Sequence, residues 1–292
     1  RSFIGNGAYV PDGSTIPEGV LIGVMSAVPR NADMQAGQTW IGSPALNLPA
    51  REVVQGYPDH LTFAPSRKRI VGRGLVEAFR IAAPHALVIA AGYAIVLDAM
   101  PLAAQGRWGA LVLDLAISGM VFGLIAFLAV AMFKWLLVGR YRTKAVPMWT
   151  PFVWLSEATT SMYEGIAIPN FLRYLRGTPW LNLAMNAMGS KIASSAYLDT
   201  TDITEHDCVT VGAHSELNAL SCPQTHLFED RVMKIDHVII GEKVTIGARC
   251  TVLYSAEVGD GAQLGPMTLV ITGKNLPAGT RWHGAPATPW KA

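Results

Sequence analysis

The sequence has few charged residues for its length, and this limits the class of protein it can encode. Only 15% of its 292 residues are Asp, Glu, Lys or Arg, whereas 51% are hydrophobic. Soluble domains average about a quarter charged residues, so contact with lipid is expected. The net charge of +2 is too small to indicate nucleic-acid binding. The three cysteines (Cys208, Cys222 and Cys250) lack disulfide-like spacing, which fits a reducing, cytosolic setting.

Several motifs of nucleotide-using and hydrolytic enzymes are missing. The sequence has no Walker A loop, no GxGxxG after a predicted strand and no GxSxG elbow. The chain is therefore not expected to bind and spend ATP. No cleavable signal peptide is visible. Because Arg1 falls within a repeat, the chain is expected to be cut from a longer protein.

What the sequence does contain is a six-residue repeat. An apolar residue recurs every sixth position near the C-terminus, and glycine often follows it. This period is neither that of a helix nor a plain alternation, and it predicts a left-handed parallel β-helix with three hexads to each coil. The recurring residues are expected to point inward: Ile240, Ile246, Val252, Val258, Leu264, Val270, Leu276 and Trp282.

The same ladder occurs at the N-terminus, which indicates an internal duplication. Residues 4–45 align without gaps on residues 246–287, with thirteen identities in 42 columns. Both ladders end alike, the first with Trp40-Ile-Gly-Ser-Pro-Ala45 and the second with Trp282-His-Gly-Ala-Pro-Ala287. We expect the first ladder to form the last coils of one β-helix module: Ile4, Val10, Ile16, Ile22, Val28, Met34 and Trp40.

Two long apolar runs separate the ladders. Residues 81–100 and 108–138 are each long enough for a helix to cross the roughly 30 Å hydrocarbon core, and residues 101–107 join them. Basic residues flank the open end of this hairpin, whereas the joining loop has only Arg107. The positive-inside rule therefore predicts a cytoplasmic membrane protein with both β-helix modules in the cytosol. The flanking basic residues are Arg67, Lys68, Arg69, Arg73, Arg80, Lys134, Arg140, Arg142 and Lys144.

These patterns predict five regions along the chain. Residues 1–60 are the end of a first β-helix module, 61–80 a basic linker, 81–138 the membrane hairpin, 139–195 interfacial helices, and 196–292 a second β-helix module. Thr178 and Pro179 predict the start of a helix in the interfacial region. Its aromatic residues are expected to form a collar at the membrane surface: Trp149, Phe152, Trp154, Phe171, Tyr174 and Trp180.

The candidate chemistry lies where the six-residue rhythm breaks, at residues 221–234. A loop that leaves a regular solenoid is a common place for function. His226 could act as a general base, and Glu229 could orient it if the loop turns helically. Asp230 is a further acidic candidate in this loop. Arg231 and Lys234 could attract a phosphate-bearing carrier arm, although all these residues could also be plainly solvated.

Other candidates remain open. His214, in a repeat turn, is a second possible base, and His206 beside Asp207 is a third. A zinc site built from His206, Cys208, Cys222 and His226 is an alternative, although the His206-x-Cys208 spacing is tight for a usual site. Our main expectation includes no metal.

The order of these features resembles a known family. A β-helix tail, a membrane hairpin, an aromatic collar and a new β-helix carrying His-Leu-Phe-Glu-Asp-Arg-Val-Met-Lys over 226–234 are similar to the membrane-embedded C-terminal region of the Pls/PosA family of nonribosomal peptide synthetases (ε-poly-lysine synthetase-like). The resemblance extends over the whole chain. It implies three tandem condensing domains, of which this chain covers the end of the second and all of the third.

The resemblance implies aminoacyl transfer, in which an amine attacks an aminoacyl thioester on the phosphopantetheine arm of a separate carrier domain. Upstream carrier and adenylation domains are the implied partners. One alternative is a hexapeptide-type acetyl- or acyltransferase that uses coenzyme A on a small molecule. Another is a non-catalytic scaffold or export-associated domain. We also expect the β-helix modules of one chain to pack as a pseudo-trimer, or as a homo-oligomer, by analogy with other proteins of this fold.

Overall fold

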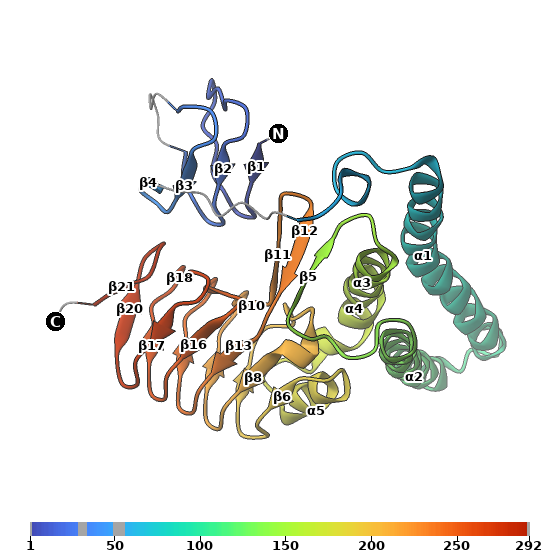
Figure 1. Cartoon of the computed structure of the whole chain (residues 1–292). Coiled ribbons are helices and arrows are strands. Elements are labelled where there is room, and N and C mark those ends of the chain that lie inside the picture. Colours follow the sequence, from blue (N-terminus) through green and yellow to red (C-terminus); the bar gives the residue numbers. More distant parts are fainter. Residues whose placement is uncertain (1, 29–33, 49–55, 291–292) are drawn as a thin grey trace.

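The computed structural model describes residues 2–28, 34–48 and 56–290 (Figure 1). It shows two β-helix modules lying side by side, with a group of helices at one end of the larger module. The first module contains β1–β4, and the second contains β6–β10 and β13–β21. A three-stranded antiparallel sheet of β5, β11 and β12 lies between the second module and the helices.

The second module is a three-sided parallel β-helix, as the six-residue repeat predicts. Strands β13 to β17 each pair in parallel with the strand three hexads later, for example Thr251 with Leu269 and Val238 with Ala256. The hand of the coil stays a prediction. The strands are β6 Lys191–Ile192, β7 Tyr197–Leu198, β8 Val209–Val211, β9 Glu216–Leu217, β10 Cys222–Gln224, β13 Val238–Ile240, β14 Thr245–Ile246, β15 Thr251–Leu253, β16 Ala256–Val258, β17 Gln263–Leu264, β18 Leu269–Val270, β19 Asn275–Leu276, β20 Arg281–His283 and β21 Thr288–Pro289.

The core of this module consists of the predicted ladder. All eight recurring residues from Ile240 to Trp282 are buried, and the most exposed of them, Trp282, has only 7% of its surface accessible. Glycine often follows the recurring apolar residue, at a corner of the coil where the backbone of the next coil leaves no room for a Cβ. A Cβ on Gly247 would lie 2.7 Å from the carbonyl oxygen of Leu264 in the next coil. The inward apolar residue and the corner glycine together explain the period of six.

The first module repeats the last coils of the second. Its strands are β1 Phe3–Ile4, β2 Leu21–Ile22, β3 Thr39–Ile41 and β4 Leu46–Leu48. Each module ends with a strand that turns back in antiparallel pairing: Trp40 faces Asn47 in the first, and Trp282 faces Pro289 at the aligned positions of the second. This shared ending supports the duplication inferred from sequence.

The two modules contact each other directly. The backbone N–H of Ser43 donates to the carbonyl oxygen of Ala285 at 2.7 Å. Val24 of the first module lies in one apolar cluster with Leu253 and Leu269 of the second, and Leu227 packs against that cluster. The predicted pseudo-trimer requires such contacts between modules, but it also requires a third module, so it stays a prediction.

Two long helices form the hairpin. Helix α1 spans Arg67–Ala104, α2 spans Trp108–Phe133, and a π-helical turn, η2, continues α2 over Lys134–Val138. Both helices are long and apolar enough to cross a membrane. The expected basic linker over 61–80 is wrong for most of its length, because α1 already begins at Arg67. Arg73 and Glu77 stabilise this first part of the helix with an ion pair at i, i+4 spacing.

A group of short helices packs beside the hairpin. It contains α3 Pro151–Met162, the π turn η3 Tyr163–Ala167, α4 Ile168–Asn170, η4 Leu172–Tyr174 and α5 Pro179–Ala187, and a further short turn, η1, spans Asp59–Leu61. α3 and η3 contact α1, and η3 and α4 contact α2. The approach of α4 is close, since a Cβ on Gly123 of α2 would lie 2.2 Å from the carbonyl oxygen of Asn170.

The predicted aromatic collar is only partly exposed. Tyr174 and Trp180 are 70% and 66% exposed, as residues at an interface would be. Trp154, in contrast, is buried and donates its indole N–H to the carbonyl oxygen of Met148, and Phe171 stacks on Phe127 of α2. The region 139–195 is therefore largely a packed helical layer, and only part of it forms an exposed aromatic surface. α5 begins at Pro179 after Thr178, as predicted.

Candidate active site

The break in the repeat at residues 221–234 is a β-hairpin that leaves the second module. β11 spans His226–Glu229, and β12 spans Val232–Ile235. Asp230 and Arg231 form the two-residue turn, both with positive φ, which is typical of a type I′ hairpin. The loop does not turn helically, so the condition under which Glu229 could orient His226 is not met. In an extended strand these two residues lie roughly 10 Å apart along the chain.

The other charged residues of the hairpin have different surroundings. Glu229 pairs across the strands with Lys234, with an oxygen–nitrogen distance of 2.9 Å. Asp230 lies at the tip of the hairpin, so the structure does not place it beside His226. Arg231 is exposed at the same tip and approaches the sulfur of Met148. The role of Arg231 and Lys234 in binding a carrier stays a prediction.

The acid that contacts His226 is Glu205, which the sequence did not indicate. Nδ1 of His226 lies 2.7 Å from Oε2 of Glu205. The hydroxyls of Thr204 and Thr225 donate to the same oxygen at 2.7 and 2.6 Å. Glu205 immediately precedes the short turn η5, His206–Cys208, and only 1% of its surface is exposed. Three donors thus fix one buried carboxylate beside the imidazole.

The two groups shift each other's protonation. Burial alone would raise the pKa of Glu205, but the charge and hydrogen bond of His226, together with the two threonine hydroxyls, lower the pKa to about 2. Burial alone would lower the pKa of His226, but the charge and hydrogen bond of Glu205 outweigh it and raise the pKa. Glu205 is therefore ionised and can only accept, so Nδ1 of His226 must be the donor.

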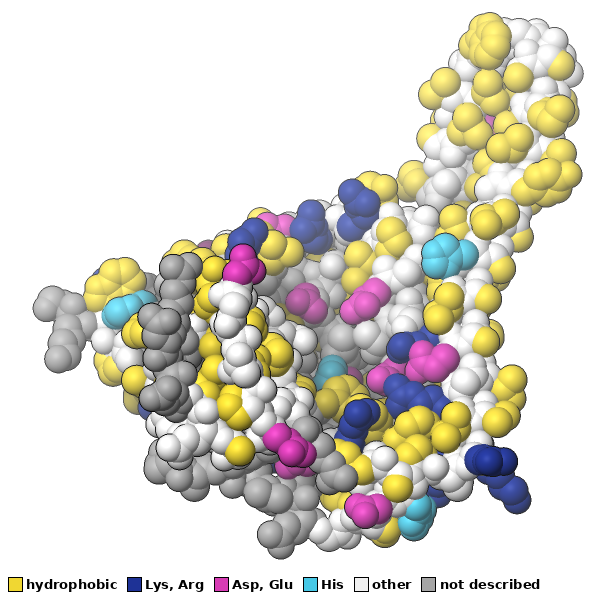
Figure 2. Space-filling model, turned by 90° about the horizontal axis from the view of Figure 1, so that it is seen from above, with side chains coloured by type: hydrophobic (Ala, Val, Ile, Leu, Met, Phe, Trp, Pro, Cys, Tyr) yellow, Lys and Arg dark blue, Asp and Glu magenta, His cyan; other side chains and the backbone are white. Residues whose placement is uncertain are grey.

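This arrangement leaves the second ring nitrogen available for chemistry. Within the described residues no hydrogen bond to Nε2 of His226 is present, and 19% of the side chain is exposed. Seen from above, the surface is hollowed between the first module and the helical part, and acidic, basic and histidine side chains line this hollow (Figure 2). A buried acid that orients a partly exposed imidazole is the usual arrangement of a general base.

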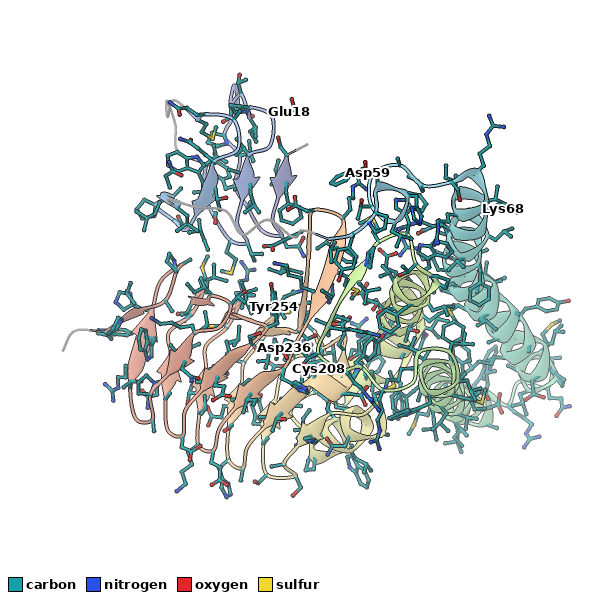
Figure 3. The ribbon with its side chains drawn as sticks, viewed as in Figure 1. Glu18, Asp59, Lys68, Cys208, Asp236 and Tyr254 are labelled. Carbon is teal, nitrogen blue, oxygen red and sulfur yellow. The ribbon has the colours of Figure 1, made fainter. Side chains whose placement is uncertain are left out.

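The foot of the hairpin is fixed by a second set of hydrogen bonds. The backbone N–H of Asp236 donates to the carbonyl oxygen of Thr225 at 3.0 Å. The carboxylate of Asp236 accepts from the hydroxyls of Thr143 and Ser255, which holds the pKa of Asp236 below its usual range despite partial burial. Figure 3 places Asp236 and Cys208 near the point where the hairpin leaves the β-helix.

The free edge of the hairpin is covered by β5, Lys144–Pro147, which pairs antiparallel with β12. Because β5 follows soon after α2 and its π turn, the segment that leaves the α1–α2 hairpin becomes part of the sheet that carries His226. Met233 and Ile235 of β12 pack in one core cluster with Trp154 of α3. The site is therefore built jointly by the β-helix and the helical layer.

The other predicted bases do not share this geometry. His206 is buried and edge-on to the ring of Tyr163, and burial together with the Lys134 charge lowers the pKa of His206 to about 4. His214 lies exposed in a turn at positive φ between β8 and β9, on other sheets than His226. In the described part of the chain no three His, Cys, Asp or Glu residues are grouped to hold a metal ion, so the structure does not bring together the four residues of the zinc alternative.

One sequence signal could have pointed to Glu205. The rhythm of six breaks not only at 221–234 but also after Leu198, where residues 199–208 precede β8. The two breaks follow the paired strands β7 and β9 of successive coils. Because successive coils stack directly on each other, segments that leave them at corresponding positions lie close together. Searching the second break for an acid would have identified Glu205.

Comparison with known proteins gives one extensive sequence match. No family model matches the chain. The chain is 52% identical over 290 residues to δ-poly-L-ornithine synthetase from Acinetobacter baumannii. The match covers 99% of this chain and 22% of that synthetase, so the chain spans about a fifth of the relative's length. Along its whole length it is thus similar to one segment of a poly-amino-acid synthetase.

Solved structures give weaker similarities. A hexapeptide-repeat acetyltransferase from Vibrio cholerae has a TM-score of 0.35 and 11% identity, over 41% of this chain and 84% of that one. Galactoside acetyltransferase in complex with coenzyme A has a TM-score of 0.32 and 12% identity, over 41% and 76%. Serine acetyltransferase from Neisseria gonorrhoeae with serine has a TM-score of 0.27 and 19% identity, over 47% and 56%.

Proposed function

We propose that this chain is the acyl-transfer part of a membrane-bound poly-amino-acid synthetase, in which it forms amide bonds between a carrier-bound aminoacyl thioester and an amine. The observation that carries the proposal is the Glu205–His226 pair, a buried carboxylate orienting a partly exposed imidazole. The 52% identity to a segment of δ-poly-L-ornithine synthetase supports the substrate class, a diamino acid with a free amine as acceptor.

In this proposal His226 moves one proton. Nε2 of His226 takes a proton from the acceptor amine as the amine nitrogen attacks the thioester carbonyl carbon. The carbon–nitrogen bond forms, the carbon–sulfur bond then breaks, and His226 returns the proton to the leaving thiolate. Glu205 accepts the Nδ1–H throughout and stabilises the transient imidazolium, with Thr204 and Thr225 holding the carboxylate in place.

The thioester is a substrate delivered from outside this chain. The proposed partners are an adenylation domain and a carrier domain with a phosphopantetheine arm, both upstream in the parent protein. The hollow between the first module and the helical part is where we place the arm and the acceptor (Figure 2). A further β-helix module packed on these two completes the proposed assembly.

We further propose that α1 and α2 cross the cytoplasmic membrane, with both modules on the cytosolic side. Their apolar side chains support this, since Ile89, Tyr93, Val112 and Met120 are among many that are largely exposed. The buried residues of α2 lie between Gly123 and Ala131, beside α4 and η3. On this side the ends of α1 and α2 pack with α3, η3 and α4.

The experiment uses the full-length parent synthetase in membranes. His226→Ala should lower product formation by about 10²–10⁴-fold, the usual contribution of a positioned base, while adenylation and carrier loading stay at wild-type rates. His214→Ala is the matched control and should retain wild-type turnover. Wild-type product formation by His226→Ala would refute the proposal and would favour a scaffold role for the module.

A further inference from the structure

A short turn connects the candidate base to the end of the apolar helix α2. Three consecutive residues, Glu205, His206 and Asp207, contact three different parts of the molecule. Glu205 binds His226, and His206 lies edge-on to Tyr163, with the ring centroids 5.0 Å apart. Asp207 binds Lys134, with 2.6 Å between Nζ and Oδ2. Because the three residues are consecutive in one short turn, a displacement of one side chain should also displace the other two.

The Lys134–Asp207 ion pair is unusually deep. Lys134 has no exposed surface, although the pattern of basic residues suggested that it flanks a membrane, and the Asp207 side chain is 11% exposed. The ammonium group also lies 3.4 Å from the centre of the Trp135 ring, and the Trp135 indole N–H donates to the carbonyl oxygen of Ala187. These contacts fix the end of α2 against α5 and against the turn η5.

The helix geometry changes at this point. Lys134 is the first residue of the π turn Lys134–Val138, which Gly139 ends at a φ of 71°. Single π turns within α-helices occur frequently at functional sites. The backbone N–H of Tyr141, two residues after Gly139, also donates to Oδ2 of Asp207 at 3.2 Å. Asp207 thus holds both sides of the junction between α2 and β5.

The turn that contains Glu205 and Asp207 cannot easily move without breaking the contacts of Asp207 with Lys134 and Tyr141. The backbone N–H of Cys208 donates to the carbonyl oxygen of Glu205 at 2.8 Å, which closes the turn. A Cβ on Gly189 would lie 2.5 Å from Oδ1 of Asp207, so the backbone there packs directly against the carboxylate. The position of Asp207 therefore determines the position of Glu205 two residues earlier.

We propose that Lys134 and Asp207 are positioning residues for the transfer reaction, and that through Glu205 they make the orientation of His226 depend on the cytosolic end of α2. This inference rests on the proposed function of His226. Stability alone gives no reason for the pair, because replacing a buried ion pair with neutral groups of similar volume is often neutral or stabilising. A role in positioning predicts instead a defect in catalysis within an intact fold.

The test compares variants of the full-length synthetase in membranes. In Lys134→Met/Asp207→Asn, methionine fills the lysine volume and asparagine keeps an acceptor for the Tyr141 N–H. We expect kcat for product formation to fall about 10-fold, since small misplacements of a reacting group cost up to about 100-fold. The acidic limb of the pH profile should shift to lower pH, while KM for the acceptor and the rate of carrier loading stay unchanged.

The pH readout reports on His226 and its neighbours. Two carboxylates raise the pKa of His226: Glu205, from the turn before β8, and Glu157, from α3. Neither is altered by the substitutions, so a shifted limb would mean that Glu205 has moved relative to the imidazole. Lys134→Arg, which keeps the charge, should restore kcat to within about threefold of wild type. The control Arg176→Met/Asp199→Asn removes an ion pair away from this turn and should leave both kcat and the limb unchanged.

Asp207→Glu is a second, independent variant. It keeps the ion pair but adds a methylene beside Gly189, so it should displace the turn and lower kcat with the protease-resistant core intact. Wild-type kcat and pH profile in Asp207→Glu would overturn the proposal, even if the double variant fails to fold. If His226→Ala abolishes turnover but these variants do not change kcat or the pH profile, the positioning role fails alone. If His226→Ala is fully active, the proposed function fails first.

Discussion

The substitution Glu205→Gln tests the candidate site most finely, because glutamine matches the size of glutamate but carries no charge. In the wild-type protein the carboxylate accepts from His226 at 2.7 Å and from two threonine hydroxyls. A hydrogen bond to a charged group contributes about 1.5–3 kcal/mol. If that stabilisation applies to the imidazolium in the transition state, its loss should lower kcat roughly 10- to 150-fold.

The same substitution has a predicted effect on pH dependence. As a base, His226 must be neutral, and Glu205 raises its pKa above the ordinary value of 6.5. The acidic limb of wild-type activity should therefore lie above this value. In Glu205→Gln the burial of His226 remains, with Glu157 as the other nearby charge, so the limb should move to lower pH. The assay is the rate of product formation by the parent synthetase between pH 5 and 9.

The Glu205–His226 pair should stabilise the fold within a limited pH range, because His226 loses its contribution at high pH and Glu205 loses its contribution at low pH. The raised pKa of His226 gives stability that is fully present below 6.5 and is lost as pH rises through the raised value. The lowered pKa of Glu205 gives stability that is present above 4.5 and is lost as pH falls towards about 2. Glu205→Gln should therefore reduce the free energy of unfolding most between these two ordinary values.

The matched control is Glu229→Gln. It removes a carboxylate whose described ion pair is with Lys234 on the other strand of the β-hairpin. It should change kcat less than twofold and leave the acidic limb in place. The reasoning is refuted if Glu205→Gln has wild-type kcat and an unshifted limb. It is also refuted if Glu229→Gln shifts the limb as far as Glu205→Gln does.

Two further predictions concern the hairpin formed by α1 and α2. A cysteine at Gln105, in the short connection between α1 and α2, should react with an impermeant thiol reagent added outside cells, whereas one at Lys144 should not; the reverse labelling would contradict the cytosolic placement of the modules. Gly123→Ala should lower the thermal stability of the purified protein in detergent by about 1–3 kcal/mol, because its Cβ would lie 2.2 Å from the carbonyl oxygen of Asn170. Gly119→Ala, with open space around its Cβ, should be neutral or slightly stabilising, and equal effects of the two substitutions would mean that α4 does not pack on α2 as described.

Much of the fold could be predicted because it repeats. Each hexad places one apolar residue inward, so the burial of Ile246 and Leu264 follows from the period alone. Trp40 and Trp282 mark the same ending in both copies. The end of the second apolar helix at Val138 also follows from local composition, as does the start of α5 at Pro179.

The parts that were missed depend on contacts between distant segments. The strand β5 pairs with β12, which lies far later in the chain, and no local pattern near Lys144 indicates a strand partner. His226 was found because it lies where the repeat breaks, but its partner Glu205 lies 21 positions earlier, in another break. Glu229 could contact His226 only in a helical turn, whereas the β-branched and apolar residues around Val232 favour a β-hairpin.

The collar shows the same limit. An aromatic residue beside a long apolar helix looks the same in sequence whether its side chain is buried or exposed. Sequence alone therefore could not show that Trp154 is buried and Trp180 is exposed. In the structure the first is buried against the hairpin sheet and the second is exposed. Packing of α3 on α1 and on the sheet of β5 and β12 buries Trp154, whereas Trp180 of α5 stays exposed.

The central claim is that His226, oriented by Glu205, catalyses transfer from carrier to amine, and a single-turnover measurement tests it most directly. The full-length synthetase in membranes is loaded with a radiolabelled aminoacyl thioester and then mixed with excess acceptor amine. We predict that wild-type enzyme and the His214→Ala control transfer the label to product at the same rate, whereas His226→Ala keeps the label on its carrier and transfers it at least 100-fold more slowly. Equal rates of transfer for wild type and His226→Ala would contradict the account.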